Sequence, residues 1–185
     1  MQRNAKLTLA ALILACTLPV VASYVTYYFW QPDDTMNYGE LIEPQALPEA
    51  TAEGIGGADI DLAGMRGHWT LLFAGAAACD EACGKALYAM RQGWLAQGEE
   101  MRRLERVWLV ADGGTPADDA VADQRGLKLA RAVPAWAERL PGVEEGGHIY
   151  LVDPLGNVMI RFPPDPDVKR LIKDLQRLLK YSRLG

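Results

Sequence analysis

Cysteine and histidine are scarce in this chain. The 185 residues include three cysteines and two histidines, and only Cys79 and Cys83 lie outside the single long hydrophobic run. Two thiolates are too few for a closed structural zinc site, which takes four ligands. Any redox or soft-metal chemistry therefore has to come from one cysteine pair, with His68 or His148 as the only histidines that could join it.

Basic residues are fewer than acidic residues in this chain. Lysine and arginine number 19 against 24 aspartates and glutamates, and residues 1–30 hold two of the basic residues and none of the acidic ones. The remaining chain therefore carries a formal charge of −7. Such a domain disfavours nucleic acid as a partner and has no basic patch for anionic lipid. Neither an internal repeat nor a low-complexity tract is present.

One hydrophobic run is long enough to cross a membrane. Leu7–Trp30 contains no charged residue, and a spanning helix needs about 20 predominantly apolar residues. Arg3 and Lys6 precede the run, whereas Asp33 and Asp34 follow it. This asymmetry predicts a cytoplasmic N-terminus and a periplasmic C-terminal domain on a single-pass anchor in a bacterial-type inner membrane.

A cleaved signal peptide and a lipoprotein signal are the alternatives for this segment. A signal peptide has an apolar core of about 7–15 residues, which is shorter than this run. Ile13–Cys16 loosely matches a lipoprotein signal, but the run continues well past Cys16. We therefore favour the anchor, in which Cys16 is an ordinary cysteine of a membrane helix.

Alternating strand and helix patterns follow the anchor. Trp69–Phe73 and Val107–Ala111 are short apolar runs typical of buried strands. The pattern from Asp80 to Glu105 is helical, and shorter helices are predicted over Asp118–Arg125 and Ala130–Leu140. Near the C-terminus, Ile149–Val152 and Val158–Phe162 flank a Pro- and Gly-containing turn and predict a β-hairpin. Asp165–Asp167 then opens an amphipathic helix that extends to about residue 180.

This order of elements predicts an α/β protein with a thioredoxin-like fold. Helices would cover both faces of a mixed sheet with a four-stranded core. The predicted organisation is a cytoplasmic tip and transmembrane anchor over residues 1–30, a Pro-rich tether over 31–57, and a thioredoxin-like exported domain over 58–185. Within the tether, Asn37–Ile42 is compatible with a short edge strand.

The stretch Cys79-Asp80-Glu81-Ala82-Cys83 lies where a central strand passes into a helix. A cysteine at a helix N-terminus has a lowered thiol pKa, although Asp80 and Glu81 oppose this by charge repulsion. As residues i and i+4 on one helical face, the two thiols could share a soft cation or form a disulfide. Copper would require one or two more ligands, for which histidine is the obvious candidate. We favour His148, which precedes the 149–152 strand, and interpret His68 as surface or structural.

These features together resemble the Sco/SenC family. The resemblance covers roughly residues 55–180 and rests on Phe73-Ala74-Gly75, the CxxxC pair, and the segment from His148 to Asn157. It implies a thioredoxin-fold, membrane-anchored protein that assembles the copper site of cytochrome c oxidase. Copper would then be bound by Cys79, Cys83 and His148. The resemblance is to a divergent member, since Asp80 and Gly84 replace prolines of the family pattern and Glu145 stands at the usual position of its histidine.

Three functions stay open at this point. The first is a copper-delivery or copper-site assembly factor, with a cytochrome c oxidase subunit as partner. The second is a thiol–disulfide oxidoreductase, in which Cys79 attacks and Cys83 resolves. The third is a non-catalytic scaffold in which the pair is a structural disulfide, since a fold alone does not establish a function.

Overall fold

The computed structural model describes residues 2–29 and 37–182, in two compact units that divide after Met36. The described part of the first unit, residues 2–29, is the helix α1 (Gln2–Phe29). Its segment Ala5–Tyr28 is long and apolar enough to cross a membrane, as the sequence predicts. The predicted tether begins outside the described residues, which resume at Asn37.

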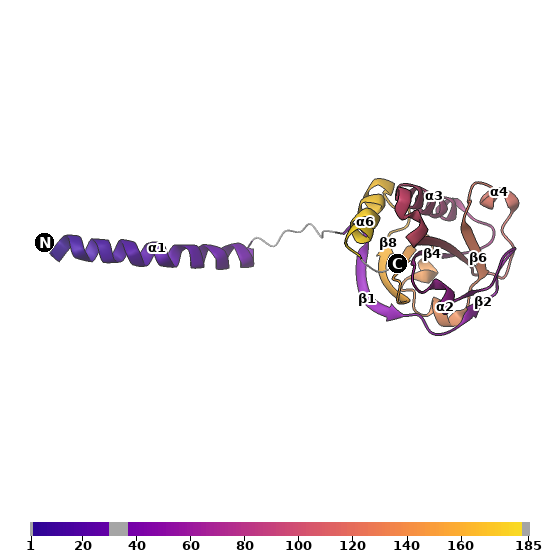
Figure 1. The fold of residues 1–185 in the computed structure, drawn as a ribbon, viewed down its shortest axis with the longest axis horizontal. Coiled ribbons are helices and arrows are strands. Elements are labelled where there is room, and N and C mark those ends of the chain that lie inside the picture. Colours follow the sequence, from indigo (N-terminus) through magenta and orange to yellow (C-terminus); the bar gives the residue numbers. More distant parts are fainter. Residues whose placement is uncertain (1, 30–36, 183–185) are drawn as a thin grey trace. The chain divides into compact units, whose positions relative to one another are not determined.

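The second unit is built on one mixed sheet (Figure 1). Its strands, in spatial order, are β1 (Glu40–Ala46), β8 (Asn157–Phe162), β7 (Ile149–Val152), β4 (Trp69–Gly75), β5 (Leu104–Val110) and β6 (Leu127–Arg131). The β4–β5 and β5–β6 pairs are parallel, whereas β4–β7, β7–β8 and β1–β8 are antiparallel. A separate antiparallel ribbon pairs β2 (Thr51–Ala52) with β3 (Ile60–Asp61). The predicted thioredoxin-like architecture is confirmed.

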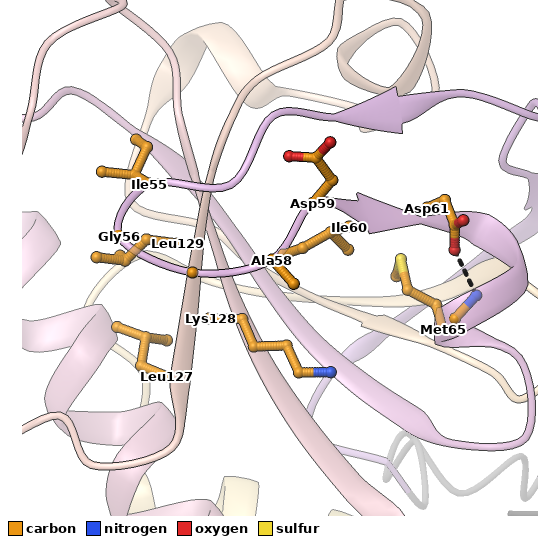
Figure 2. A pocket seen from close by; sticks show the side chains of 12 residues that line it. Ile55, Gly56, Ala58, Asp59, Ile60, Asp61, Met65, Leu127, Lys128 and Leu129 are labelled. Atoms are coloured by element: carbon orange, nitrogen blue, oxygen red, sulfur yellow. Dashed lines mark hydrogen bonds between the residues drawn. The ribbon is translucent and has the colours of Figure 1, made fainter.

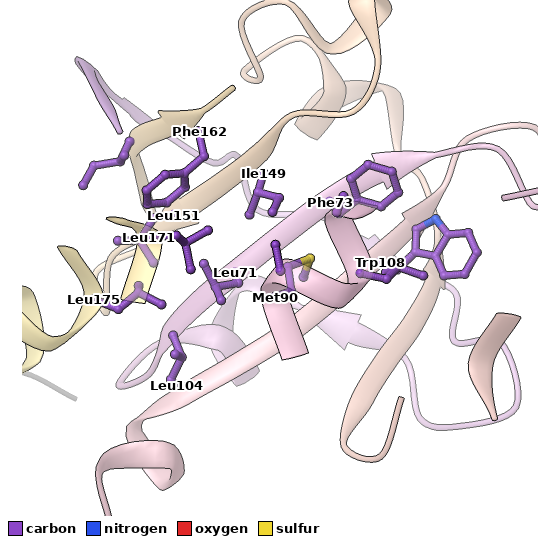
Figure 3. Packing of buried hydrophobic residues seen from close by; sticks show 14 of the residues in the cluster. Leu71, Phe73, Met90, Leu104, Trp108, Ile149, Leu151, Phe162, Leu171 and Leu175 are labelled. Carbon is purple, nitrogen blue, oxygen red and sulfur yellow. The ribbon is translucent and has the colours of Figure 1, made fainter. Parts of the chain in front are cut away.

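Two long helices cover one face of the sheet. These are α3 (Glu81–Leu95) and α6 (Val168–Tyr181). Their apolar side chains pack on alternate residues of the central strands, because successive strand residues point to opposite faces. Figure 3 shows this layer, in which Met90 and Leu171 lie against strand residues such as Leu71. Gly93 permits the close approach of α3 to α6, since a Cβ there would lie 2.6 Å from Leu171 Cδ2.

Shorter elements cover the opposite face. The helices on this side are α2 (Leu62–Met65) and α5 (Pro134–Ala137). The fully buried Trp136 is the largest side chain of this second layer, and its indole N–H donates to the Pro48 carbonyl at 3.0 Å. The remaining elements are the 3-10 turns η1 (Gly98–Arg103) and η2 (Val143–Glu145) and the short helix α4 (Asp118–Val121).

Hydrogen bonds join the first described residues of the domain to α6 and its N-cap. The buried carboxylate of Asp174 accepts hydrogen bonds from the backbone N–H groups of Tyr38 and Gly39 at 2.7 and 2.9 Å. The Tyr38 hydroxyl in turn accepts from the Asp167 N–H at 2.8 Å. These contacts lead directly into β1, so part of the segment interpreted as a tether lies on the domain and supplies the expected edge strand.

The predicted four-stranded core is present as β8, β7, β4 and β5, with β1 added at the expected edge and β6 at the other. Two local predictions need correction. Residues around Ala130 were predicted to be helical, but β6 occupies 127–131 and only Pro134–Ala137 is helical. The helix predicted to reach Glu105 ends at Leu95, and β5 begins at Leu104. The edge strand β6 was missed because the charged residues Lys128 and Arg131 interrupt its apolar pattern.

Candidate functional site

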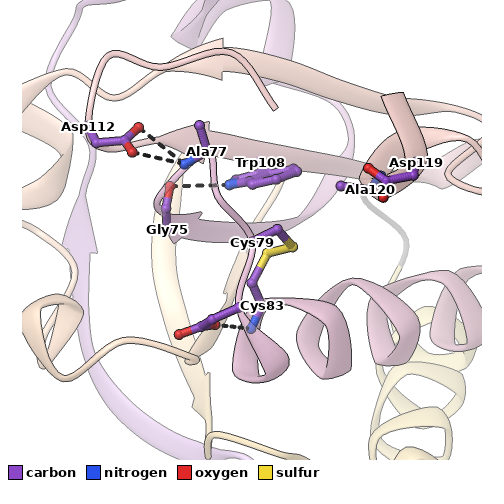
Figure 4. The surroundings of a disulfide bond; sticks show 9 residues. Gly75, Ala77, Cys79, Cys83, Trp108, Asp112, Asp119 and Ala120 are labelled. Carbon is purple, nitrogen blue, oxygen red and sulfur yellow. Dashed lines mark hydrogen bonds between the residues drawn. A yellow bond between two sulfur atoms is a disulfide. The ribbon is translucent and has the colours of Figure 1, made fainter. Parts of the chain in front are cut away.

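Cys79 and Cys83 form a disulfide at the point where β4 passes into α3 (Figure 4). Cys83 lies in the first turn of α3 and is 4% exposed, whereas Cys79 is partly exposed and lies two residues before the helix. The backbone of Cys79 is left-handed, with φ of 44°. The pair therefore spans the helix start instead of sharing one helical face, and only Cys79 is open to solvent. The third cysteine, Cys16, is a free thiol in α1.

Asp80 caps the helix that carries Cys83. Its carboxylate accepts a hydrogen bond from the Cys83 N–H at 2.9 Å, which satisfies one of the unpaired donors at the helix start. The remaining N–H groups and the helix dipole favour negative charge in this turn. After reduction, a thiolate on Cys83 would lie at this favourable end of a 15-residue helix.

Asp112 holds the loop that leads into Cys79. Its carboxylate oxygens accept from the Ala77 N–H at 3.1 and 3.2 Å, and Oδ1 also accepts from the Gly114 N–H at 3.1 Å. Hydrogen bonds from these two backbone groups, that of Ala77 first, lower the pKa of Asp112. The Trp108 indole N–H donates to the Gly75 carbonyl at 3.3 Å and fixes the end of β4 beside it (Figure 4).

Two cavities flank the disulfide. The first, of about 360 Å³, lies between the motif and the loop before β7, and both sulfur-bearing residues line it together with Asp80 and Glu145. The second, of about 370 Å³, lies between the motif and the α4 segment, and Cys79 but not Cys83 lines it. A reagent can therefore reach Cys79 from two sides.

His148 does not line either of these cavities. It is 7% exposed, its Nδ1 lies 2.9 Å from the Phe162 carbonyl oxygen, and its Nε2 lies 3.2 Å from Glu145 Oε2. Both ring nitrogens are thus engaged within the domain. Glu145, three residues earlier, is the side chain that this loop presents to the first cavity.

The structure brings together two of the three predicted copper ligands. Cys79 and Cys83 are joined, but His148 is held by Phe162 and Glu145. Over residues 2–29 and 37–182, no group of three histidine, cysteine, aspartate or glutamate side chains is arranged to hold a metal ion. The donor set of this arrangement therefore does not fit a three-ligand copper site, and the assignment of His148 as a ligand stays a prediction.

A third cavity, of about 360 Å³, lies away from the cysteines (Figure 2). It is formed by the segment around β3 and by the edge strand β6, and its walls are mostly apolar. Its two acidic residues, Asp59 and Asp61, accept hydrogen bonds from the backbone N–H groups of Gly54 and Gly64 at 2.9 and 2.6 Å. These carboxylates shape the backbone, and neither cysteine nor histidine lines the cavity.

Sequence reasoning missed the roles of Asp112 and Glu145. Asp112 follows β5, and the carboxyl ends of adjacent parallel strands meet at one edge of a sheet, where ligands commonly bind in α/β proteins. The acidic residue after the second apolar run was therefore a usable signal. For Glu145 the signal lay in the family resemblance, because Glu145 stands at the usual position of the family's histidine, but its approach to the cysteines depends on the conformation of the loop before β7.

Comparison with protein-family models agrees with the thioredoxin-like fold. The family model described as transmembrane-like, thioredoxin-like, C-terminal domain matches residues 69–182. The chain belongs to this family. The matched region includes β4, the disulfide, β7, β8 and α6, so the family assignment covers the whole candidate site. No curated protein matches the chain in sequence.

Solved structures with the same fold include copper proteins and a redox protein. Bradyrhizobium japonicum ScoI with copper bound is 17% identical with a TM-score of 0.58, and the match covers 72% of this chain and 99% of that chain. Yeast Sco1 with copper bound is 14% identical with a TM-score of 0.63, covering 76% and 96%. The thioredoxin domain of a Bacteroides vulgatus thiol-disulfide oxidoreductase is 16% identical with a TM-score of 0.53, covering 76% and 99%. The predicted resemblance to Sco/SenC proteins is thus confirmed as a likeness of fold.

Proposed function

We propose that this chain is a membrane-anchored, Sco-like thiol–disulfide exchange protein that works through Cys79 and Cys83. One observation carries this proposal: a partly exposed Cys79, which lines two cavities, is bonded to a buried Cys83. Reactive cysteines are accessible and lie near helix N-termini, whereas structural disulfides are typically buried and inert. In this arrangement a partner can react with the sulfur of Cys79, whereas the sulfur of Cys83 stays buried.

The two sulfurs have different roles in this chemistry. A partner thiolate attacks Cys79, the accessible sulfur, and the electron pair of the broken bond goes to Cys83. The thiolate left on Cys83 lies in the first turn of α3, where the helix dipole stabilises it. In the reverse direction, Cys79 attacks a partner disulfide and Cys83 resolves the mixed disulfide.

The client that we propose is a cysteine-containing subunit of a respiratory cytochrome c oxidase, whose copper-site thiols must be reduced before metal can bind. The Sco-like fold and the candidate membrane span support this proposal. The charge asymmetry around the span supports a cytoplasmic N-terminus and a periplasmic domain. An oxidising compartment is where a disulfide of this kind forms and persists.

Copper binding is the second candidate, favoured by the copper bound to solved proteins of this fold. Reduction would give two thiolates, which are soft ligands suited to Cu(I). Cys79 and Cys83 would supply them, and His148 would have to leave its contacts with Phe162 and Glu145 to join them.

Thiol exchange and copper binding can be separated with three variants. The oxidised full chain in detergent is mixed with a dithiol peptide, acid-quenched and alkylated, and the redox state is measured by mass spectrometry. We expect stoichiometric transfer of two electrons in the wild type and in His148→Ala, and no transfer in Cys79→Ser or Cys83→Ser. A folded wild-type protein whose disulfide resists the peptide at all concentrations would contradict the proposal.

The copper candidate is tested on the reduced protein. Cu(I) affinity is measured against a competing chelator for the wild type and for His148→Ala. Two-thiolate binding predicts equal affinity in both proteins. A loss of affinity in the variant would support the three-ligand site.

A further inference from the structure

The charged residues that line the two cavities beside Cys79 are all acidic. Asp80 and Glu145 line the first cavity, and Asp119 and Asp123 line the second. Among the described residues that line these two cavities there is neither lysine nor arginine. Figure 4 shows Asp119 beside Ala120 in the α4 segment, which lines the second cavity together with Cys79.

The nearest basic side chain on the motif helix is already neutralised. Lys85 Nζ lies 2.9 Å from Asp165 Oδ2 and 3.1 Å from Glu81 Oε1. Two carboxylates thus face one ammonium group, and the net charge of this cluster is also negative. The approach to Cys79 is therefore lined by carboxylates on both sides.

Resting on the proposed exchange function, we infer that the partner whose thiols reduce the Cys79–Cys83 disulfide, and so regenerate the reduced pair that acts on the client, is a polypeptide segment with lysine or arginine beside its reactive cysteine. The attacking species in thiol–disulfide exchange is a thiolate, which is itself negative. Carboxylates around the target sulfur repel that thiolate unless positive side chains accompany it. Basic residues flanking the partner cysteine would face Asp119 and Asp123 in the second cavity and accelerate association.

The exchange step balances without a further reagent. The partner thiolate bonds to Cys79 Sγ, the bond between Cys79 and Cys83 breaks, and its electron pair leaves on Cys83 as a thiolate. A second thiolate of the same partner then attacks the partner sulfur of the mixed disulfide and releases the Cys79 thiolate. Two electrons pass to the protein, and the partner dithiol becomes a disulfide.

Three peptides test the inference on the oxidised full chain in detergent. They share one dithiol core and differ only in flanking residues, which are lysine, serine or glutamate. Second-order rate constants are divided by those measured with hydroxyethyl disulfide, a small neutral disulfide, which removes differences in thiol reactivity between the peptides. We expect the lysine peptide to react at least about tenfold faster than the glutamate peptide at low salt. This difference should shrink in about 1 M salt, where charges are screened within about 3 Å.

Matched variants locate the effect. Asp119→Asn/Asp123→Asn removes two charges from the second cavity and should reduce the preference for the lysine peptide by severalfold. Glu43→Gln/Glu99→Gln removes the same charge from exposed positions that line neither cavity, and should leave the preference unchanged. A preference that falls equally in both variants would overturn the inference.

Dithiothreitol separates this inference from the proposed function, because it is an uncharged thiol reagent. Rapid reduction of the folded protein by dithiothreitol together with equal rates for the three peptides would overturn the inference and leave exchange intact. Resistance of the folded protein to dithiothreitol would instead overturn the proposed function.

Discussion

Reduction of the Cys79–Cys83 disulfide is expected to weaken the domain without unfolding it. The two cysteines are four positions apart, so the bond closes a very short loop. For about five residues, the chain-entropy model gives an unfolded-state entropy loss of about 7 cal/mol/K, or about 2 kcal/mol at 25 °C. Domains of this kind have free energies of unfolding of about 5–15 kcal/mol, so the reduced protein should remain folded.

Thermal unfolding of the full chain in detergent measures this effect. Near-ultraviolet circular dichroism follows tertiary packing of the domain, which holds the buried Trp108 and Trp136. For a domain of about 150 residues, a loss of about 2 kcal/mol lowers the Tm by about 4–8 °C. The matched control is Cys79→Ser/Cys83→Ser, which should melt near the reduced wild type and should not respond to reductant.

Loss of the tertiary signal on reduction at 25 °C would refute this reasoning. A fall in Tm far beyond 10 °C would do the same, because a loop of this length cannot supply it through chain entropy. Either result would favour the scaffold interpretation, in which the disulfide is structural.

Three further predictions concern the framework around the site. Asp174→Ala removes the acceptor of the Tyr38 and Gly39 N–H groups and should lower the free energy of unfolding, measured in urea, by about 3 kcal/mol. An equal loss in the exposed control Lys173→Ala would contradict a specific role for the Asp174 carboxylate. Asp112→Ala should lower the free energy of unfolding at neutral pH. Because folding lowers the pKa of Asp112, the wild type should be more stable than the variant at pH values above the ordinary aspartate pKa of 3.8. This difference in stability should narrow as the pH falls through the pKa of the folded state. A difference in stability between the wild type and Asp112→Ala that stays constant down to pH 2 would contradict a stabilising role for the Asp112 carboxylate. Gly93→Ala places a Cβ 2.6 Å from Leu171 Cδ2 and should cost about 1–3 kcal/mol through overpacking between α3 and α6, while Gly84→Ala, with open space around its Cβ, should be neutral or stabilising.

The buried centre of this fold is readable from the sequence because its strands are apolar and its turns carry proline and glycine. The hairpin of β7 and β8 and the amphipathic α6 follow directly from these patterns. The edge strands are harder to predict. Most side chains of β1 are exposed, and β6 buries only Ala130, so neither shows the apolar run of a buried strand.

The candidate site was predictable only where it depends on local sequence. The CxxxC spacing identifies the cysteine pair, and the preceding apolar strand places it at a helix start. The surroundings depend on tertiary structure: Asp112 reaches Ala77 across 35 positions, and Glu145 lines the cavity because of the loop conformation before β7. The direction of the His148 ring depends on the Phe162 carbonyl, which local sequence does not encode.

The central claim is that Cys79 and Cys83 form a redox-active pair, and its most direct test is a redox titration. The folded full chain in detergent is equilibrated with thiol–disulfide buffers of defined potential, and free thiols are trapped and counted by mass. We expect one two-electron transition, with Cys79 and Cys83 converting together at a potential above about −300 mV, as for catalytic rather than structural disulfides. A disulfide that stays oxidised to well below that potential until the domain unfolds would contradict the account.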